Sequence, residues 1–280
     1  MWKPHHSLVR TLYRLGSHNR PSRVVGHLAD ARLPAPVLNR IIAAYVRAWK
    51  VRMDEVEVPS GGFRTLDEFF TRRLKAGARP LASLPVVSPC DGRVVAEGPV
   101  EAGTLVQAKG LRYSLADLIG EEALAARLEG GRYVTIYLSP RDYHRVHVPL
   151  DGELLAWRHL PGALFTVAPG ATRLVNNLLV RNERFVLAIR GVAGMEAALV
   201  MVGAANVGRI TSVFCPATTN SGRDFGQGRC EPPVPIRQGQ EAGAFHLGST
   251  VVLVLRSPRP LRPAVQVGQS LRMGEGLYEA

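Results

Sequence analysis

The strongest constraint on the fold is the succession of short β-type runs from residue 85 to the end of the chain. These runs are rich in β-branched and aromatic residues, too short for typical helices, and separated by glycine, proline and polar turn residues. The 28 glycines and 20 prolines among 280 residues also favour many turns over long helices. The sequence therefore predicts a mainly β core. The predicted strands are 93–96, 132–138, 185–189, 198–202, 209–214 and 250–255.

The first 58 residues have a helical pattern instead. Residues 36–51 repeat apolar side chains at helical spacing along one face, and residues 8–15 repeat the pattern in a shorter segment that Gly16 ends. The prediction is an α+β protein, with N-terminal amphipathic helices in a segment 1–58 and a mainly β catalytic core over 59–280. The apolar face of the longer helix is formed by Leu38, Ile41, Ile42, Tyr45, Val46 and Trp49.

Three further segments have local signals. Residues 55–62 are typical of a linker, because they end in Pro59-Ser60-Gly61-Gly62. Thr65 and Glu68 then have the spacing of a capping box, which predicts a helix through about residue 76. Residues 115–129, rich in alanine, leucine and glutamate, predict one helix within the β region.

Positive charge is concentrated near the N-terminus. The whole chain carries a net charge of +12, and residues 1–50 hold nine Lys or Arg against the single Asp30, a net of +8. Each basic residue close to an anionic membrane is worth about 1 kcal/mol. The helices are therefore expected either to pack on the core or to lie on an anionic membrane surface. A basic amphipathic helix is also compatible with nucleic acid, but no nucleic-acid motif is recognised and no such partner is expected.

The sequence also bears on the compartment. No apolar stretch reaches the roughly 18 to 20 residues of a membrane-spanning helix, and charged residues interrupt the first 15 positions where a signal peptide would have its apolar segment. We expect a peripheral protein on the cytoplasmic side of the cell membrane. The three cysteines, Cys90, Cys215 and Cys230, fit neither a disulfide framework nor a zinc site and are expected to be reduced thiols. Cys90 is expected to be a small buried residue.

The tetrapeptide Leu247-Gly248-Ser249-Thr250 indicates self-cleavage. A serine that follows a glycine can attack the open glycine carbonyl with its hydroxyl and convert the Gly248–Ser249 amide into an ester. Removal of the Ser249 α-proton then expels the ester, and the resulting dehydroalanine hydrolyses to a pyruvoyl group. This chemistry predicts a β chain of residues 1–248 and an α chain of residues 249–280.

Self-cleavage needs a base, and histidine has a pKa suited to it. His144 and His147 are the candidates, three residues apart, and they face the same side only if the chain bends there. A His-x-x-His pair is also found in metal sites, but no third and fourth ligand stands at a useful spacing, so no metal is predicted. Asp91, in a Pro-x-Asp-Gly turn, offers a carboxylate that could orient an imidazole.

Three of these segments, in this order, resemble phosphatidylserine decarboxylase, a family of self-processing pyruvoyl enzymes. They are residues 88–94 (SPCDGRV), 142–149 (DYHRVHVP) and 247–250 (LGST). The resemblance covers nearly the whole chain, and the shared order of the motifs is highly specific. Further matching stretches are 69–72 (FFTR), 109–110 with 113–115 (KG and YSL), 161–165 (PGALF), 181–184 (RNER) and 202–204 with 207–208 (VGA and VG).

The resemblance implies the function and the roles of the residues. Phosphatidylserine would be the substrate, decarboxylated to phosphatidylethanolamine and CO₂ through a Schiff base to a pyruvoyl group that derives from Ser249, with no separate cofactor. It implies Asp91 as the residue that orients the base, His147 as the base, and Ser249 as the nucleophile and pyruvoyl precursor. It assigns His144 to the decarboxylation step. The β and α chains would stay together, and a homo-oligomer is compatible with the sequence.

Other functions remain open on the residues alone. A serine hydrolase could use Asp91, His147 and Ser249, although no Gly-x-Ser-x-Gly segment surrounds Ser249. A non-catalytic membrane-binding homologue would stay uncut. A related pyruvoyl enzyme could act on another serine lipid or on a soluble amino acid. His246, just before the cleavage tetrapeptide, is expected to be a strand residue that faces water, and Arg141 and Arg145 receive no role.

Overall fold

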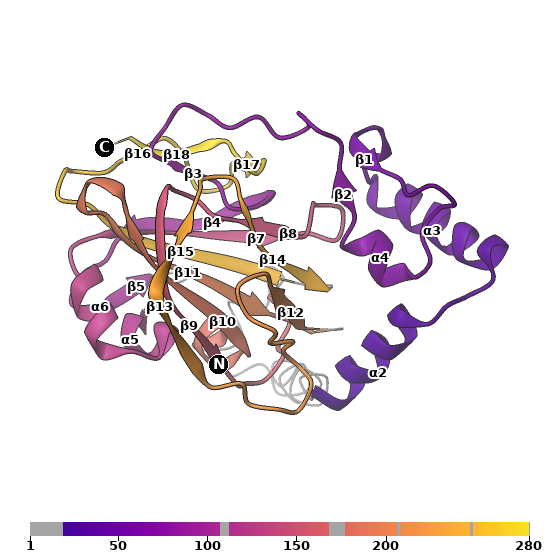
Figure 1. Ribbon diagram of the computed structural model, residues 1–280, viewed down its shortest axis with the longest axis horizontal. Coiled ribbons are helices and arrows are strands. Elements are labelled where there is room, and N and C mark those ends of the chain that lie inside the picture. The colour runs from indigo at the N-terminus through magenta and orange to yellow at the C-terminus, as the bar shows by residue number, and fades with distance from the viewer. Residues whose placement is uncertain (1–18, 107–111, 168–176, 206–207, 247–248, 280) are drawn as a thin grey trace, which may run out of the picture.

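The fold is centred on an eight-stranded antiparallel sheet (Figure 1). The computed structural model describes residues 19–106, 112–167, 177–205, 208–246 and 249–279. The strand order is β13-β9-β10-β11-β15-β7-β4-β17. Their bounds are β4 Gly92–Pro99, β7 Arg132–Leu138, β9 Gly152–Leu160, β10 Arg184–Gly191, β11 Glu196–Gly203, β13 Gln227–Ile236, β15 Ser249–Arg256 and β17 Ser270–Leu271.

Strand β15 lies at the centre of this sheet because it is apolar on both faces. Val251 and Leu253 pack into one hydrophobic cluster, whereas Val252 and Val254 pack into the other on the opposite face. A continuous apolar run, rather than an alternating one, is typical of a strand that is covered on both sides. The strand predicted at 250–255 therefore lies inside the sheet and is covered on both faces, and Ser249 is the first residue of β15.

Small sheets cover one face of the central sheet and helices cover the other. The first cluster joins the central sheet to the sheets β12-β14-β8 and β16-β18-β3, and the second joins it to α5, α6 and α7. The bounds are β3 Val86–Val87, β8 Arg145–His147, β12 Arg209–Ser212, β14 Glu241–His246, β16 Arg262–Pro263, β18 Gly276–Glu279, the pair β5 Thr104–Val106 and β6 Arg112–Ser114, α5 Leu115–Ile119, α6 Glu122–Leu128, α7 Leu178–Arg181 and the 3₁₀ turn η4 Val192–Gly194.

The N-terminal helices lie together at one end of the molecule, beside the ends of β7 and β14 (Figure 1). On α3, Leu38 and Ile42 are buried against Phe63 and Phe69, and the Tyr45 hydroxyl donates a hydrogen bond of 2.8 Å to the Pro140 carbonyl. One face of the helix thus docks on the rest of the chain. The bounds are α2 Asn19–Asp30, α3 Ala35–Trp49, η1 Met53–Glu55, β1 Val56–Glu57, α4 Leu66–Phe70 and β2 Arg73–Leu74.

The predicted fold class is confirmed, and the helix at 36–51 corresponds to α3. The shorter helix predicted at 8–15 lies outside the described residues. All three cysteines are free, and Cys90 is fully buried, as expected. Within the described part of the chain, no helix combines the length and the apolar character that crossing a membrane requires.

Three local predictions need correction. Thr65 caps the helix as predicted, with the Glu68 amide donating to its Oγ1 at 3.0 Å, but the Glu68 carboxylate accepts from the Arg64 amide and not from that of Thr65. Helix α4 ends at Phe70 because the chain turns to pair β2 with β1. The predicted linker 55–62 contains β1 for the same reason. The helix predicted at 115–129 is broken into α5 and α6 at Gly120, whose φ of 72° is left-handed and ends α5.

Candidate active site

Ser249 is placed deep in the central sheet. It pairs with Gly203 of β11 on one side and Leu138 of β7 on the other, and its side chain has no exposed surface. Its Oγ has no hydrogen-bond partner among the described residues. By the two-residue period of a strand, Ser249 shares the sheet face of Val251, which β8 and β14 cover. Gly248, the predicted residue before the cleavage point, lies outside the described residues.

His144 is a buried neutral imidazole with an unused nitrogen. Its Nδ1 lies 2.8 Å from the Asp142 carbonyl, which can only accept, so Nδ1 carries the proton and Nε2 carries the lone pair. That Nε2 is buried and has no partner among the described residues. The ring packs on Phe70, with 4.2 Å between ring centroids. Burial lowers the pKa of His144 to about 3, so the ring stays neutral at pH 7 and Nε2 keeps a lone pair that can accept a hydrogen bond.

His147, on β8, is held at both nitrogens. Its Nδ1 donates to the Gly239 carbonyl at 2.8 Å, and its Nε2 accepts from the Tyr143 hydroxyl at 3.1 Å. Burial again lowers the pKa of the ring. Its backbone neighbour Val146 packs into the first hydrophobic cluster, so on the strand His147 points to the opposite side. In this arrangement the basic nitrogen of His147 is already occupied by a hydroxyl.

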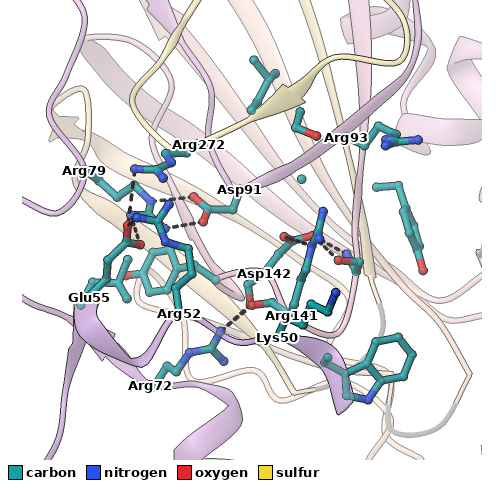
Figure 2. Close-up of a pocket in the computed structure, with 18 of the residues that line it drawn as sticks. Lys50, Arg52, Glu55, Arg72, Arg79, Asp91, Arg93, Arg141, Asp142 and Arg272 are labelled. Atoms are coloured by element: carbon teal, nitrogen blue, oxygen red, sulfur yellow. Dashed lines mark hydrogen bonds and ion pairs between the residues drawn. The ribbon is translucent and has the colours of Figure 1, made fainter. Parts of the chain in front are cut away.

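The turn that contains Asp91 is hydrogen-bonded to the His147 backbone, but the Asp91 carboxylate bonds to Arg79 and not to the His147 ring. The His147 amide donates to the Pro89 carbonyl at 2.7 Å, which joins β8 to the Pro-x-Asp-Gly turn. The Asp91 carboxylate, however, accepts two hydrogen bonds from Arg79, at 2.8 and 2.6 Å, and one from the Met273 amide at 2.8 Å. Figure 2 shows Asp91 turned toward Arg79. The structure therefore forms no hydrogen bond between Asp91 and His147.

Sequence reasoning assigned no role to two of the groups around this site. Arg79 is the ion partner of Asp91, and nothing near it in the sequence identifies that pairing. Asn182, fully buried, donates from Nδ2 to the carbonyls of Phe165 and Gly203, both at 2.8 Å, and thereby fixes the strand end beside Ser249. Its only sequence signal is its place in the motif 181–184.

The prediction for His246 is half wrong. The residue is on strand β14, as expected, but its side chain is only 12% exposed and does not face water. Its Nδ1 donates to the Asp67 carboxylate at 2.7 Å, and its Nε2 lies 3.1 Å from Thr211 Oγ1. Asp67 comes from α4, so the helical end of the molecule supplies the buried partner that the local sequence of β14 does not reveal.

A cavity of about 600 Å³ lies beside Asp91, between the N-terminal helices and the ends of β4, β7 and β17 (Figure 2). Asp91 and Tyr143 contribute to its wall, whereas Ser249, His144 and His147 do not. The predicted residues thus fall into two places. Ser249, His144 and His147 are buried around β15 and β8, whereas Asp91 lines the cavity.

Comparison with known proteins identifies the family. The family model for phosphatidylserine decarboxylase matches residues 66–279. The chain belongs to the phosphatidylserine decarboxylase family. It is thus a member of a family of carboxy-lyases, and the match includes every predicted site residue.

Curated relatives in this family are similar along almost their whole length. A phosphatidylserine decarboxylase proenzyme of Anaeromyxobacter sp. (strain K) is 43% identical over 270 residues, which cover 94% of this chain and 95% of the relative. Proenzymes of the same name from Brevibacillus brevis and Bordetella pertussis are 40% and 42% identical, covering 93% and 94% of this chain and 95% and 91% of theirs. The similarity therefore includes most of the N-terminal segment.

Proposed function

We propose that this chain decarboxylates phosphatidylserine to phosphatidylethanolamine and CO₂, with a pyruvoyl group made from Ser249 by self-cleavage after Gly248. The observation that carries the proposal is the buried Ser249 hydroxyl, which has no partner among the described residues and begins a strand that is buried on both faces. A polar group left without a hydrogen bond in a core is costly, so it is usually retained for a function.

The surroundings of Ser249 fit a pyruvoyl group. The group would form from atoms of Ser249 itself, in a place that excludes solvent, and no additional binding residues would be needed. When formed, it supplies an electrophilic carbonyl that withdraws electrons as CO₂ leaves. A dry site protects such a carbonyl from side reactions with water. His144 would hold or return a proton at Nε2, the nitrogen that its bond to Asp142 leaves free.

Self-cleavage would use the Ser249 hydroxyl as nucleophile and His147 as base. For this role the His147 ring, which points away from the cluster on the Ser249 face, must turn and exchange the Tyr143 hydroxyl at Nε2 for the hydroxyl of Ser249. Asp91 would act through the turn that it stabilises, because the Pro89 carbonyl of that turn holds the His147 backbone. The proposal therefore gives Asp91 a positioning role unless its carboxylate leaves Arg79.

The serine hydrolase alternative has less support. A hydrolytic triad requires a carboxylate bonded to one imidazole nitrogen and the serine hydroxyl bonded to the other. Here the His147 nitrogens bond to Gly239 and Tyr143, and the Asp91 carboxylate bonds to Arg79. Neither link of a triad is formed among the described residues.

Intact-mass analysis of the purified full-length protein tests the proposed function. Self-cleavage predicts that the 30.4 kDa chain resolves into fragments of residues 1–248 and 249–280, the smaller with a blocked, carbonyl-reactive N-terminus. A serine hydrolase and a non-catalytic homologue both predict one uncut chain. An uncut protein that decarboxylates phosphatidylserine at a full rate would refute the proposal.

Replacement of Asp91 by asparagine should slow self-cleavage by at least tenfold. The change removes one of the two carboxylate charges that Arg79 pairs with, so the turn whose Pro89 carbonyl holds the His147 amide is less firmly fixed and the base is displaced. Newly translated precursor would be followed by gel electrophoresis, with a thermal melt in parallel. Glu55→Gln is the matched control, because Glu55 is the other carboxylate on Arg79, at 2.8 Å, and takes no part in the Pro89–Asp91 turn. Equal rates in both variants would remove Asp91 from the mechanism.

We also propose that the exposed face of the N-terminal helices binds an anionic membrane surface, on the cytoplasmic side of the cell membrane. Docking of Leu38 and Ile42 leaves Val37 and Ile41 exposed on the same helix, at 45% and 40%. These two are four residues apart and therefore neighbours on one face of α3. Apolar contact and the positive charge of the segment then favour the same surface.

The double variant Val37→Ser/Ile41→Ser should bind vesicles of phosphatidylcholine and phosphatidylglycerol at least tenfold more weakly in a sedimentation assay. Each apolar side chain that no longer enters the membrane forfeits about 1.5–3 kcal/mol. Point substitutions are preferable to deletion of the segment, because deletion would expose Phe63 and Phe69. Val192→Ser/Val267→Ser, at two other exposed positions, is the control. Equal binding by both double variants would place the contact surface elsewhere.

A further inference from the structure

We propose that the cavity beside Asp91 is a binding site for the phosphodiester of a phospholipid headgroup. The inference deepens the proposed function and rests on it for the lipid nature of the ligand. Seven lysine or arginine residues and three aspartate or glutamate residues line the cavity, an excess of four positive charges. Its volume of about 600 Å³ is within the usual range for small-ligand sites.

One wall of the cavity is largely neutralised by its own ion pairs. Arg79 bonds to both Asp91 and Glu55, at 2.6 and 2.8 Å. Glu55 also pairs with Arg52 at 2.5 Å and lies 3.4 Å from Arg272. Figure 2 shows this network gathered on one side of Asp91. The charges of these cations are already neutralised by carboxylates. Their ion pairs stabilise the cavity wall and leave little positive charge for a ligand.

The remaining cations of the cavity are largely free. Within the described residues, Lys50 and Arg93 form no ion pair, and Arg141 has only a 3.7 Å approach to Asp142. The Asp142 carboxylate instead accepts hydrogen bonds of 2.7 and 2.6 Å from the amide and hydroxyl of Ser139. In Figure 2 these cations lie on the other side of Asp91 from Arg79. An anion that entered there would meet two unpaired charges, Lys50 and Arg93, and the weakly paired Arg141, from three separate segments of the chain.

Arg72 gives a second, independent indication. It is only 4% exposed and lines the cavity, yet its guanidinium donates only to the carbonyls of Phe70, Arg141 and Asp142. Its Nε has no partner among the described residues, and no carboxylate of that part of the chain lies within ion-pair distance. Buried charges in proteins are normally paired. The missing counter-charge is what a bound phosphate would supply.

The mouth of the cavity favours a phosphate that carries a lipid. Trp49, 46% exposed, lines the cavity directly beside Lys50, at the end of the helix whose outer face presents Ile41. Tryptophan beside a basic residue is typical of the boundary between headgroups and acyl chains. Free phosphate would contact only the cations, whereas a phospholipid would also contact the exposed apolar side chain of Trp49.

The cavity is also close to the cleavage strand. Ser139 lines it, and Leu138, the preceding residue, pairs with Ser249 on the adjacent strand, about 5 Å away across the sheet. The phosphodiester could belong to the substrate itself or to a neighbouring anionic lipid that holds the enzyme on the surface. Both sources offer the same chemistry to Lys50, Arg93 and Arg72.

The first test measures binding without turnover, in full-length protein that carries Ser249→Ala. Lys50→Gln/Arg93→Gln in this background should bind vesicles of phosphatidylcholine and phosphatidylglycerol about tenfold or more weakly, since each basic residue near an anionic surface contributes several-fold. Arg223→Gln/Arg259→Gln is the matched control, because it removes the same charge from exposed positions outside both the cavity and the N-terminal segment. A loss no larger than that of the control would indicate general surface attraction.

The second test measures turnover of dispersed short-chain phosphatidylserine by the processed enzyme. A KM that rises several-fold in Lys50→Gln/Arg93→Gln, with a much smaller change in kcat, assigns the site to the phosphate of the substrate. A selective loss of vesicle binding with an unchanged KM assigns it to a neighbouring lipid. If neither quantity differs from the control, the inference is wrong. Vesicle binding needs no cleavage, so failure of the wild-type chain to cut itself would defeat the proposed function alone.

Discussion

Ser249→Ala should leave the protein as one uncut chain of 30.4 kDa with no decarboxylase activity. The variant lacks the hydroxyl that must attack the Gly248 carbonyl and the oxygen that must later be expelled, so neither cleavage nor a pyruvoyl group can follow. The effect is a complete loss rather than a reduced rate. Intact mass and product assay on the same preparation measure both consequences.

The structure predicts that this loss is chemical and not a folding defect. Ser249 Oγ is buried without a partner among the described residues, so its removal breaks no hydrogen bond there and leaves only a small gap. The melting temperature should therefore stay close to that of the uncut precursor. Ser257→Ala, at a serine just beyond the end of the same strand, should cut normally. A Ser249→Ala chain that is still cut at this position would refute the proposed mechanism.

The main features of the fold could be predicted because its central strands are unambiguous. Residues 251–255 are apolar on both faces, and residues 132–138 are rich in β-branched and aromatic side chains; such runs are typical of strands inside a covered sheet. Strand β13 was missed because three prolines interrupt it, and prolines are tolerated there only because β13 is at the edge of the sheet. Position in a sheet is a tertiary property that a local pattern does not contain.

The sequence motifs nominate site residues but do not reveal their contacts. The motifs nominate Asp91, His144, His147 and Ser249, whose roles stay predictions; the structure shows His147 on β8 and Ser249 at the start of β15. The motifs did not show that Asp91 pairs with Arg79, since that pairing depends on how residues 73–91 fold back on the sheet. His246 was misplaced for a similar reason, because its partner Asp67 is 179 residues away in the chain.

Replacement of each histidine by asparagine should have a different effect: one substitution should block self-cleavage and the other should reduce turnover. His147→Asn should remain uncut, because the proposed base for Ser249 is gone. His144→Asn should be cut normally but lose about 10²- to 10⁴-fold in turnover, the usual contribution of a positioned proton donor or acceptor. The asparagine amide can keep each donated bond, to the Gly239 carbonyl at 147 and to the Asp142 carbonyl at 144, so the change removes mainly the basic nitrogen.

The structure makes this comparison decisive. Among the described residues, His144 Nε2 has no hydrogen-bond partner, whereas His147 Nε2 accepts a hydrogen bond from the Tyr143 hydroxyl. The unoccupied basic nitrogen is therefore that of His144. If His144→Asn stays uncut while His147→Asn is cut, the two roles must be exchanged. Because the pKa of His144 is about 3, the ring should remain neutral as the pH falls from 7 to 5, and its contribution should persist over that range. A loss of turnover near pH 6 in the wild-type protein that His144→Asn abolishes would show that His144 titrates normally and is not the buried neutral base that the structure describes.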